Sequence, residues 1–156
     1  MGTPISALTA ARHMCERSDW TLSNLKLQKM LYLAQMLYMG EHHERLMDGT
    51  FEAWDYGPVL PTVYNEVKTY GSGPIRSILF GRGAIGDEKR RATLDDAYDQ
   101  LASKTAGQLV NITHWDQGAW AKNYVQGGRR ITIPDADIEA EYQARVERAK
   151  ARQAAG

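Results

Sequence analysis

The sequence predicts a mainly α-helical fold: a single compact helical domain with a central buried helix and one small β-hairpin. Three observations lead to this fold class. Apolar residues recur at helical spacing in most segments of the 156-residue chain. Residues 22–41 are apolar on almost every side, which is typical of a helix enclosed by other helices. Only residues 46–56 combine an alternating pattern with a turn signal, which is typical of a hairpin.

The first two helices have recognisable start and stop signals. We expect the first to begin at Thr3-Pro4, because a hydroxyl can cap a helix and proline favours its first position. The second, capped by Thr21 or Ser23, is expected to continue to about Glu41, past a stop signal at Gly40.

The hairpin is expected to turn at Asp48-Gly49 and to end at Gly57-Pro58, since both dipeptides favour turns. A third helix follows over residues 61–68. The glycine-rich residues 71–91 are expected to form a long loop with one short helical turn. The remaining elements are helices over about residues 93–105, 107–113 and 116–125, a short extended piece at 131–133, and a last helix opening at Pro134.

Residues 1–145 are expected to form the domain and residues 146–156 a basic, frayed tail. In the tail, Val146 and a few alanines are the only apolar residues. A helix with so narrow an apolar stripe gains little from packing.

Composition limits the possible functions. With 19 basic and 19 acidic residues the formal net charge is zero, which argues against a dedicated nucleic-acid binder. The single Cys15 excludes an intramolecular disulfide and fits a reducing compartment. The longest apolar run, residues 30–39, is far shorter than the ~20 residues that span a bilayer. Residues 1–10 lack a signal-peptide pattern. We therefore expect a cytoplasmic protein with no membrane partner.

No catalytic residue, metal site or cofactor is predicted. The glycine pattern at 81–86 matches a dinucleotide-binding motif only by letter, since it follows a loop and lacks the acidic residue farther on. The adjacent His42 and His43 diverge by about 100° on a helix and lack the spacing of a metal pair. His114 lies near Asp116, but no nucleophile is close in sequence. We therefore favour a structural, hydrogen-bonded role for His114 over a catalytic role in an enzyme.

Two sets of residues are candidates for a functional site. Trp and Tyr dominate protein–protein hot spots, although burial in the core is a competing interpretation. We expect at least one of four aromatic residues to be partly exposed and to contact a partner: Trp54, Tyr64, Tyr70 and Trp115. The second set is a structural motif formed by Lys26, Gln28, Lys29, Tyr56, Gly57 and Pro58. Its polar side chains lie in an apolar helix and need partners, expected at carbonyls near the 56–58 turn, where Gly57 takes a special backbone conformation.

Three stretches carry a resemblance: residues 22–32 (LSNLKLQKMLY), 52–59 (EAWDYGPV) and 70–75 (YGSGPI). Together with Tyr64 they resemble the Panacea family, the bacterial and phage domain of SocA-like antitoxins and of GepA-like phage-associated proteins. The chain departs from the family at Ala119-Trp120, where a Pro-Trp pair is expected, and at residues 81–91.

The resemblance implies a mainly helical antitoxin without catalytic residues, which binds and neutralises a cognate toxin. The family pairs this domain with many unrelated toxins, so the toxin is not identified; it is SocB-like if the chain is a SocA-type proteolytic adaptor that presents the toxin to the protease ClpXP. The alternative is a DNA-binding regulator of its own operon, with six phosphate contacts: Arg82, Lys89, Arg90, Arg91, Arg129 and Arg130.

Overall fold

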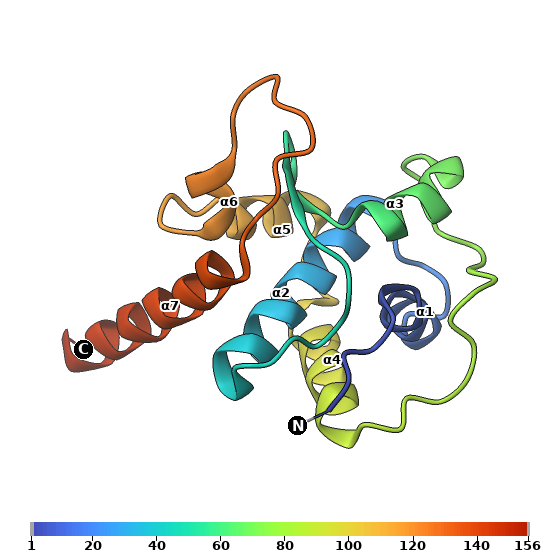
Figure 1. The fold of residues 1–156 in the computed structure, drawn as a ribbon, viewed down its shortest axis with the longest axis horizontal. Helices are drawn as coiled ribbons and strands as arrows, with labels where there is room; N and C mark the ends of the chain where they lie inside the picture. The colour runs from blue at the N-terminus through green and yellow to red at the C-terminus, as the bar shows by residue number, and fades with distance from the viewer. Residues whose placement is uncertain (1, 156) are drawn as a thin grey trace.

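One helix passes through the middle of the molecule in the computed structural model, which describes residues 2–155. This helix is α2 (Asn24–His42), and residues 27–36 within it are all buried. Around it pack α1 (Ala7–Arg17), α4 (Glu88–Leu101), α5 (Ala106–Thr113) and α7 (Asp135–Ala155), as Figure 1 shows. The mainly α-helical fold class with a central buried helix is confirmed.

The ends of α2 are set by a cap and a left-handed residue. The Ser23 hydroxyl accepts a hydrogen bond from the Lys26 N–H, and His43 ends the helix with φ 56°. Gly40 does not stop the helix, so that prediction was wrong. A Cβ on Gly40 would lie 2.0 Å from the ring of Tyr142, so glycine is needed here for the close approach of α7 to α2.

The first helix begins at Ala7, and the predicted start at Thr3-Pro4 was wrong. Ile5 is extended instead: its N–H donates to the Leu46 carbonyl, and its own carbonyl accepts from the Asp48 N–H. The Asp48 carboxylate also accepts a hydrogen bond from the Ala7 N–H at 2.8 Å. A segment 41 residues away therefore decides where α1 begins.

The hairpin consists of β1 (Glu52–Trp54) and β2 (Gly57–Val59), which pair antiparallel with Ala53 opposite Pro58. The predicted turn at Asp48-Gly49 was wrong, since the chain turns at residues 55–56. The hairpin itself is confirmed, and so is the extended piece at 131–133. This piece lies along β1, where the Ala53 N–H donates to the Ile131 carbonyl.

After the hairpin come α3 (Pro61–Val67) and the 3-10 helix η1 (Lys68–Tyr70). Within the predicted loop 71–91, residues 71–87 are mostly irregular apart from a turn at 71–72, and residues 88–91 already form the first turn of the next helix. The next helix, α4, begins at Glu88 rather than near residue 93, because the Asp87 side chain caps it by accepting from the Arg90 N–H. The short α6 (Ala119–Asn123) is smaller than the predicted helix over 116–125.

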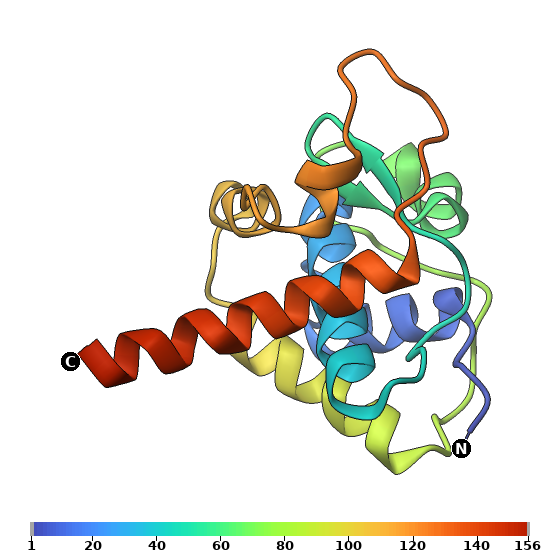
Figure 2. The same ribbon diagram turned by 60° about the vertical axis from the view of Figure 1, so that its left-hand side comes forward.

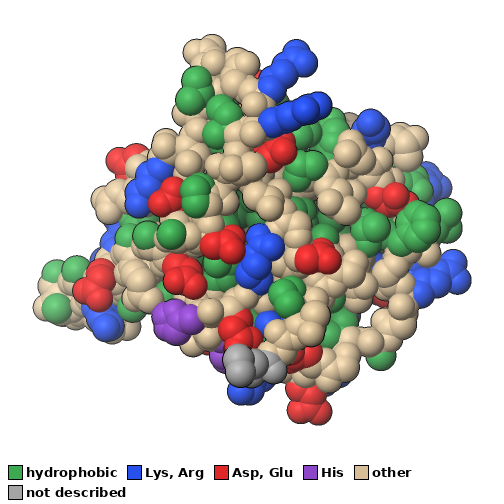
Figure 3. Space-filling view, viewed as in Figure 1, with side chains coloured by type: hydrophobic (Ala, Val, Ile, Leu, Met, Phe, Trp, Pro, Cys, Tyr) green, Lys and Arg blue, Asp and Glu red, His purple; other side chains and the backbone are tan. Residues whose placement is uncertain are grey.

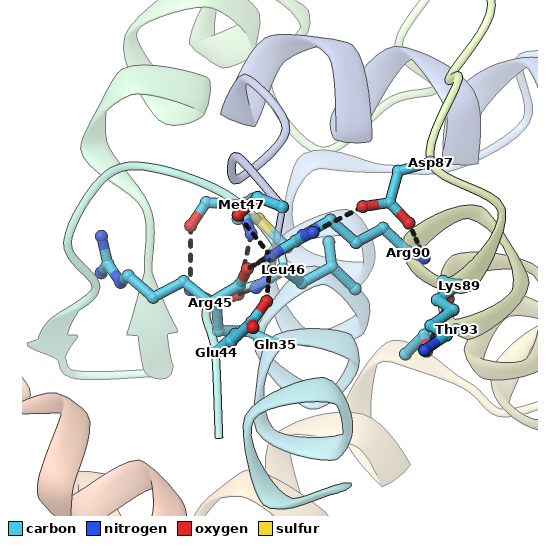
Figure 4. Close-up of polar contacts among 10 residues, drawn as sticks. Gln35, Glu44, Arg45, Leu46, Met47, Asp87, Lys89, Arg90 and Thr93 are labelled. Carbon is cyan, nitrogen blue, oxygen red and sulfur yellow. Dashed lines mark hydrogen bonds and ion pairs between the residues drawn. The ribbon is translucent and has the colours of Figure 1, made fainter. Parts of the chain in front are cut away.

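A buried arginine ties α4 to the chain that leaves α2. Arg90 is 1% exposed, and its guanidinium contacts the carboxylates of Asp87 and Glu44 and the carbonyl of Arg45 (Figure 4). It also lies over the Tyr38 ring, 4.7 Å from the centroid. Each nitrogen of the buried guanidinium thus meets an acceptor, which offsets the cost of taking its charge out of water.

The two halves of α7 have different surroundings. The first half crosses α2, where the buried Glu141 accepts hydrogen bonds from the Tyr32 hydroxyl at 2.6 Å and the Ala119 N–H at 2.9 Å. The second half projects away from the rest of the molecule (Figure 2), and residues 147–155 are exposed. The helix continues through Ala155, so fraying of the 146–156 segment in solution stays a prediction.

Candidate functional site

A groove of about 860 Å³ opens between the first half of α2, the hairpin, α3 and residues 128–130. These segments are far apart in the sequence and meet at the end of the molecule where the hairpin stands (Figure 1). Residues from the stretches 22–32 and 52–59 line the groove, together with Tyr64. Those from the two stretches include Leu25, Gln28, Lys29, Trp54, Tyr56 and Val59.

Two polar side chains of α2 hold the hairpin in place. The Lys29 ammonium donates a hydrogen bond to the Pro58 carbonyl at 2.8 Å, which is the type of partner expected for it. The Gln28 side chain accepts from the Leu60 N–H at 2.7 Å, so its partner is an amide rather than a carbonyl. Each bond satisfies a buried backbone group that follows the hairpin turn.

Gly57 is required where α2 and the hairpin touch. Its φ is +110°, a conformation that L-residues rarely adopt, so the predicted special backbone conformation is confirmed. A Cβ there would lie 2.8 Å from Lys29 Cε and 2.8 Å from Thr113 Oγ1. A side chain at this position would therefore push the hairpin away from both α2 and α5.

Lys29 is buried, and among residues 2–155 its ammonium forms no ion pair. Burial lowers its pKa from 10.5 to about 7, because the charged form loses its hydration. The pKa of His114 is also lowered, first by burial and then by the nearby charge of Lys29. Lys29, which lines the groove, and the nearby His114 are thus both weakly basic.

A stack of aromatic rings lies next to the hairpin and is hydrogen-bonded to it. The His114 ring stacks on Trp120 at 3.8 Å between centroids, and Trp120 stacks on Tyr124 at 4.6 Å. The Trp120 indole N–H donates to the Trp54 carbonyl at 2.7 Å. Within residues 2–155 the buried Nε2 of His114 has no hydrogen-bond partner, so the prediction of a hydrogen-bonded histidine was wrong for this nitrogen. The residue acts by ring packing instead.

Three aromatic side chains face the groove and remain accessible. Trp54 and Tyr64 are partly exposed and meet edge to face, with centroids 4.7 Å apart. Tyr56, at the hairpin turn, is 69% exposed. These residues combine ring area with a rigid backbone, which are the properties of hot-spot residues in protein interfaces.

Basic residues stand at the edges of the groove. Lys68 contributes from η1, and Arg129 and Arg130 from the loop that crosses above the hairpin. Figure 3 shows basic side chains next to apolar ones at this end of the molecule. Lys68 and Leu25 were not among the predicted site residues; the Gly127-Gly128 break before Arg129 was the available signal for an exposed loop.

Two other predicted residues lie outside the groove. Tyr70 is partly exposed on η1, and its hydroxyl donates to the Ser77 carbonyl at 3.4 Å. Lys26 points toward α4 and donates to the Ala102 carbonyl at 2.7 Å. Lys26 therefore joins α2 to the end of α4 rather than to the hairpin.

Trp115 lies in a separate hollow of about 270 Å³ beside α7. Its partly exposed ring is flanked by the guanidinium groups of Arg145, at 4.8 Å, and Arg148, at 5.8 Å. The four aromatic candidates are all partly exposed, but the structure brings only Trp54 and Tyr64 together.

The cations proposed as phosphate contacts do not gather on one surface. Arg90 is buried against Asp87 and Glu44, so its assignment to a phosphate was wrong. Arg129 and Arg130 line the groove. Arg82 and Arg91 line another hollow, which also contains Glu16 and Asp95.

The described residues include few groups suited to metal binding or nucleophilic chemistry. In the part of the chain that the structure describes, no three His, Cys, Asp or Glu residues are placed to hold a metal ion. Burial raises the pKa of the Cys15 thiol to about 12, which keeps it protonated and unreactive. Among residues 2–155 there is also no helix both long and apolar enough to span a bilayer.

Comparisons with known proteins identify the family of this chain. Residues 27–121 match the family described as "Antitoxin SocA-like, Panacea domain". The chain is 32% identical to the protein named Antitoxin SocA from Caulobacter vibrioides, in an alignment that covers 65% of this chain and 60% of the length of that relative. No solved structure matches. Because the family match covers more than half of the chain and includes the hairpin and most of α2, this protein belongs to the SocA-like antitoxin family defined by the Panacea domain.

Proposed function

We propose that this protein is an antitoxin that neutralises a toxin by binding part of it in the groove between α2, the hairpin and α3. One observation carries the proposal. The three stretches that resemble the family, residues 22–32, 52–59 and 70–75, meet at this groove, where Lys29 and Gln28 hold the hairpin that presents Trp54 and Tyr56. A hairpin held by two buried hydrogen bonds therefore supports an accessible aromatic surface, which suits the recognition of a protein.

The same features agree with a non-catalytic role for this protein and with a location in the cytoplasm. The groove contains aromatic and apolar residues rather than a nucleophile beside a base. Family membership also favours a binding role, since the related protein is named an antitoxin. The regulator of its own operon is less well supported, because the proposed phosphate contacts are divided between the groove, another hollow and the interior.

Co-expression with the product of the neighbouring reading frame tests the proposal. We expect the two proteins to co-purify and this chain to restore growth that the partner inhibits. Trp54→Ala or Tyr64→Ala should weaken binding by roughly 2 kcal/mol while the melting temperature stays near that of the parent.

Trp115→Ala is the matched control, because Trp115 is an equally accessible aromatic residue outside the groove. If Trp115→Ala weakens binding and the groove variants do not, the toxin contacts the α7 side instead. If no variant changes binding, or no toxin binds, the proposed function is wrong.

We also propose that the protein can act as a proteolytic adaptor that delivers a SocB-like toxin to ClpXP. The observation that favours it is the exposed second half of α7, which projects from the molecule (Figure 2) and carries Arg148, Lys150 and Arg152. A projecting basic helix is accessible to a protease while the groove holds the toxin.

A further inference from the structure

The acidic and basic residues of the groove differ in whether they have partners. The Glu52 carboxylate accepts a hydrogen bond from the Trp54 indole at 2.9 Å, and Asp55 accepts one from the Tyr124 hydroxyl. Both carboxylates are thus already engaged within the protein. Their negative charge remains, but their positions are set by internal bonds.

The exposed basic residues of the groove are unpaired within the described part of the chain. Among residues 2–155, the side chains of Lys68, Arg129 and Arg130 form no ion pair and no hydrogen bond, and all three are exposed. Two partly exposed arginines elsewhere do have acidic partners: Arg17 meets Asp99 at 2.6 Å, and Arg45 meets Asp135 at 3.1 Å. The groove therefore presents three cations that form no ion pair with another described residue.

Arg129 and Arg130 lie on the loop 127–130, whose backbone has a defined conformation. Gly127 has φ +76° and the non-glycine Arg130 has φ +57°, so two residues within four have a left-handed backbone conformation. The Gly128 N–H closes a turn on the Val125 carbonyl at 2.9 Å. Next to the loop, residues 131–133 are attached to β1. The arginines are therefore carried by an anchored loop.

We infer that the groove binds an acidic segment of the partner protein, whose carboxylates pair with Lys68, Arg129 and Arg130 while its apolar side chains pack on Trp54 and Tyr64. This inference rests on the proposed function and adds the chemistry of the bound segment. Unpaired cations around an apolar surface favour such a segment because opposite charges steer its approach and fix its orientation. A volume of about 860 Å³ admits several side chains.

A polypeptide fits this surface better than a nucleic acid does. Glu52 and Asp55 remain in the lining and repel a continuous phosphate backbone. The aromatic residues are accompanied by Leu25, Val59 and Pro61, which offer apolar contacts for side chains and few for a sugar. A peptide can alternate charged and apolar groups to match this arrangement.

The first test uses the purified toxin. We compare the wild type with Arg129→Glu/Arg130→Glu, and use Arg82→Glu/Lys89→Glu as the matched control, since that double variant carries the same charge change at exposed residues outside the groove. The groove variant should bind the toxin about ten-fold more weakly or worse, mainly through slower association, and its affinity should depend less on salt. The control should bind as the wild type does.

The outcomes separate the inference from the proposed function. If Trp54→Ala weakens toxin binding but Arg129→Glu/Arg130→Glu leaves both affinity and salt dependence unchanged, the inference is overturned and the function stands. If no toxin binds, the function fails, and a second test still decides the chemistry of the groove.

The second test selects binders from a random-peptide display library on the wild-type protein. Enrichment of Asp and Glu beside apolar residues is expected, together with loss of the selected peptides on Arg129→Glu/Arg130→Glu. Peptides with Lys in place of Glu should prefer that variant. Enrichment of basic or uncharged peptides overturns the inference. So does a single-stranded DNA oligonucleotide that binds the groove in competition with the selected peptides.

Discussion

Lys29 makes folding stability depend on pH in a specific way. Burial lowers its pKa from 10.5 to about 7, so the folded state prefers the neutral amine. A shift of roughly 3.5 units corresponds to at most about 5 kcal/mol. Below the folded pKa both states are protonated and the full cost of burying the charge is present. Between the two pKa values the unfolded state binds one more proton, so stability rises with pH.

The assay is urea unfolding at about pH 7.5 and about pH 8.5, for the wild type and for Lys29→Met. The wild type should gain about 1 kcal/mol across this interval, because close to one proton separates the two states. Methionine has a similar volume and no titrating group, so this gain should disappear. The substitution also leaves the Pro58 carbonyl without its donor, which costs about 1–3 kcal/mol at every pH and does not change the slope.

Other titrating groups do not mimic this signal. His114, whose pKa is lowered, titrates below the interval, and the Cys15 thiol in the unfolded chain titrates near 9.0, above most of it. Both groups are present in the two proteins and cancel in the comparison. Equal slopes for wild type and Lys29→Met would show that the folded protein keeps Lys29 at an ordinary pKa, and the argument about its burial would be refuted.

Three further predictions address the core, the hairpin and the C-terminal helix. Leu31→Asp places a charge at a fully buried position of α2 and should cost several kcal/mol, enough to unfold the protein; an unchanged melting temperature would show that α2 is not central. Gly57→Val should destabilise by roughly 3–6 kcal/mol, from backbone strain and displacement of Lys29, and circular dichroism during heating measures it. Removal of residues 146–156 should leave folding and toxin binding nearly unchanged, but should stop toxin degradation by reconstituted ClpXP. Degradation at the parental rate would locate the protease contact elsewhere.

The sequence by itself determined the features that depend on local pattern. Residues 27–36 are apolar on nearly every side, and the only stable place for such a helix is the centre of the fold. Gly57, between an aromatic residue and a proline, indicated a backbone that other residues avoid, and its φ of +110° agrees. In both cases a property of a few neighbouring residues is sufficient to predict the result.

Only the tertiary structure decided which contacts are made by residues whose local sequence signal is ambiguous. Asp48-Gly49 favours a turn locally, but Asp48 bonds to Ala7 across 41 residues and the hairpin turns elsewhere. Gly40 has the composition of a helix stop, yet it admits the ring of Tyr142. Local propensities amount to about 1 kcal/mol or less per residue, and burial of side chains and distant hydrogen bonds outweigh them. For the same reason no local pattern predicts the groove, in which Arg129 lies across from Trp54 only because packing brings their segments together.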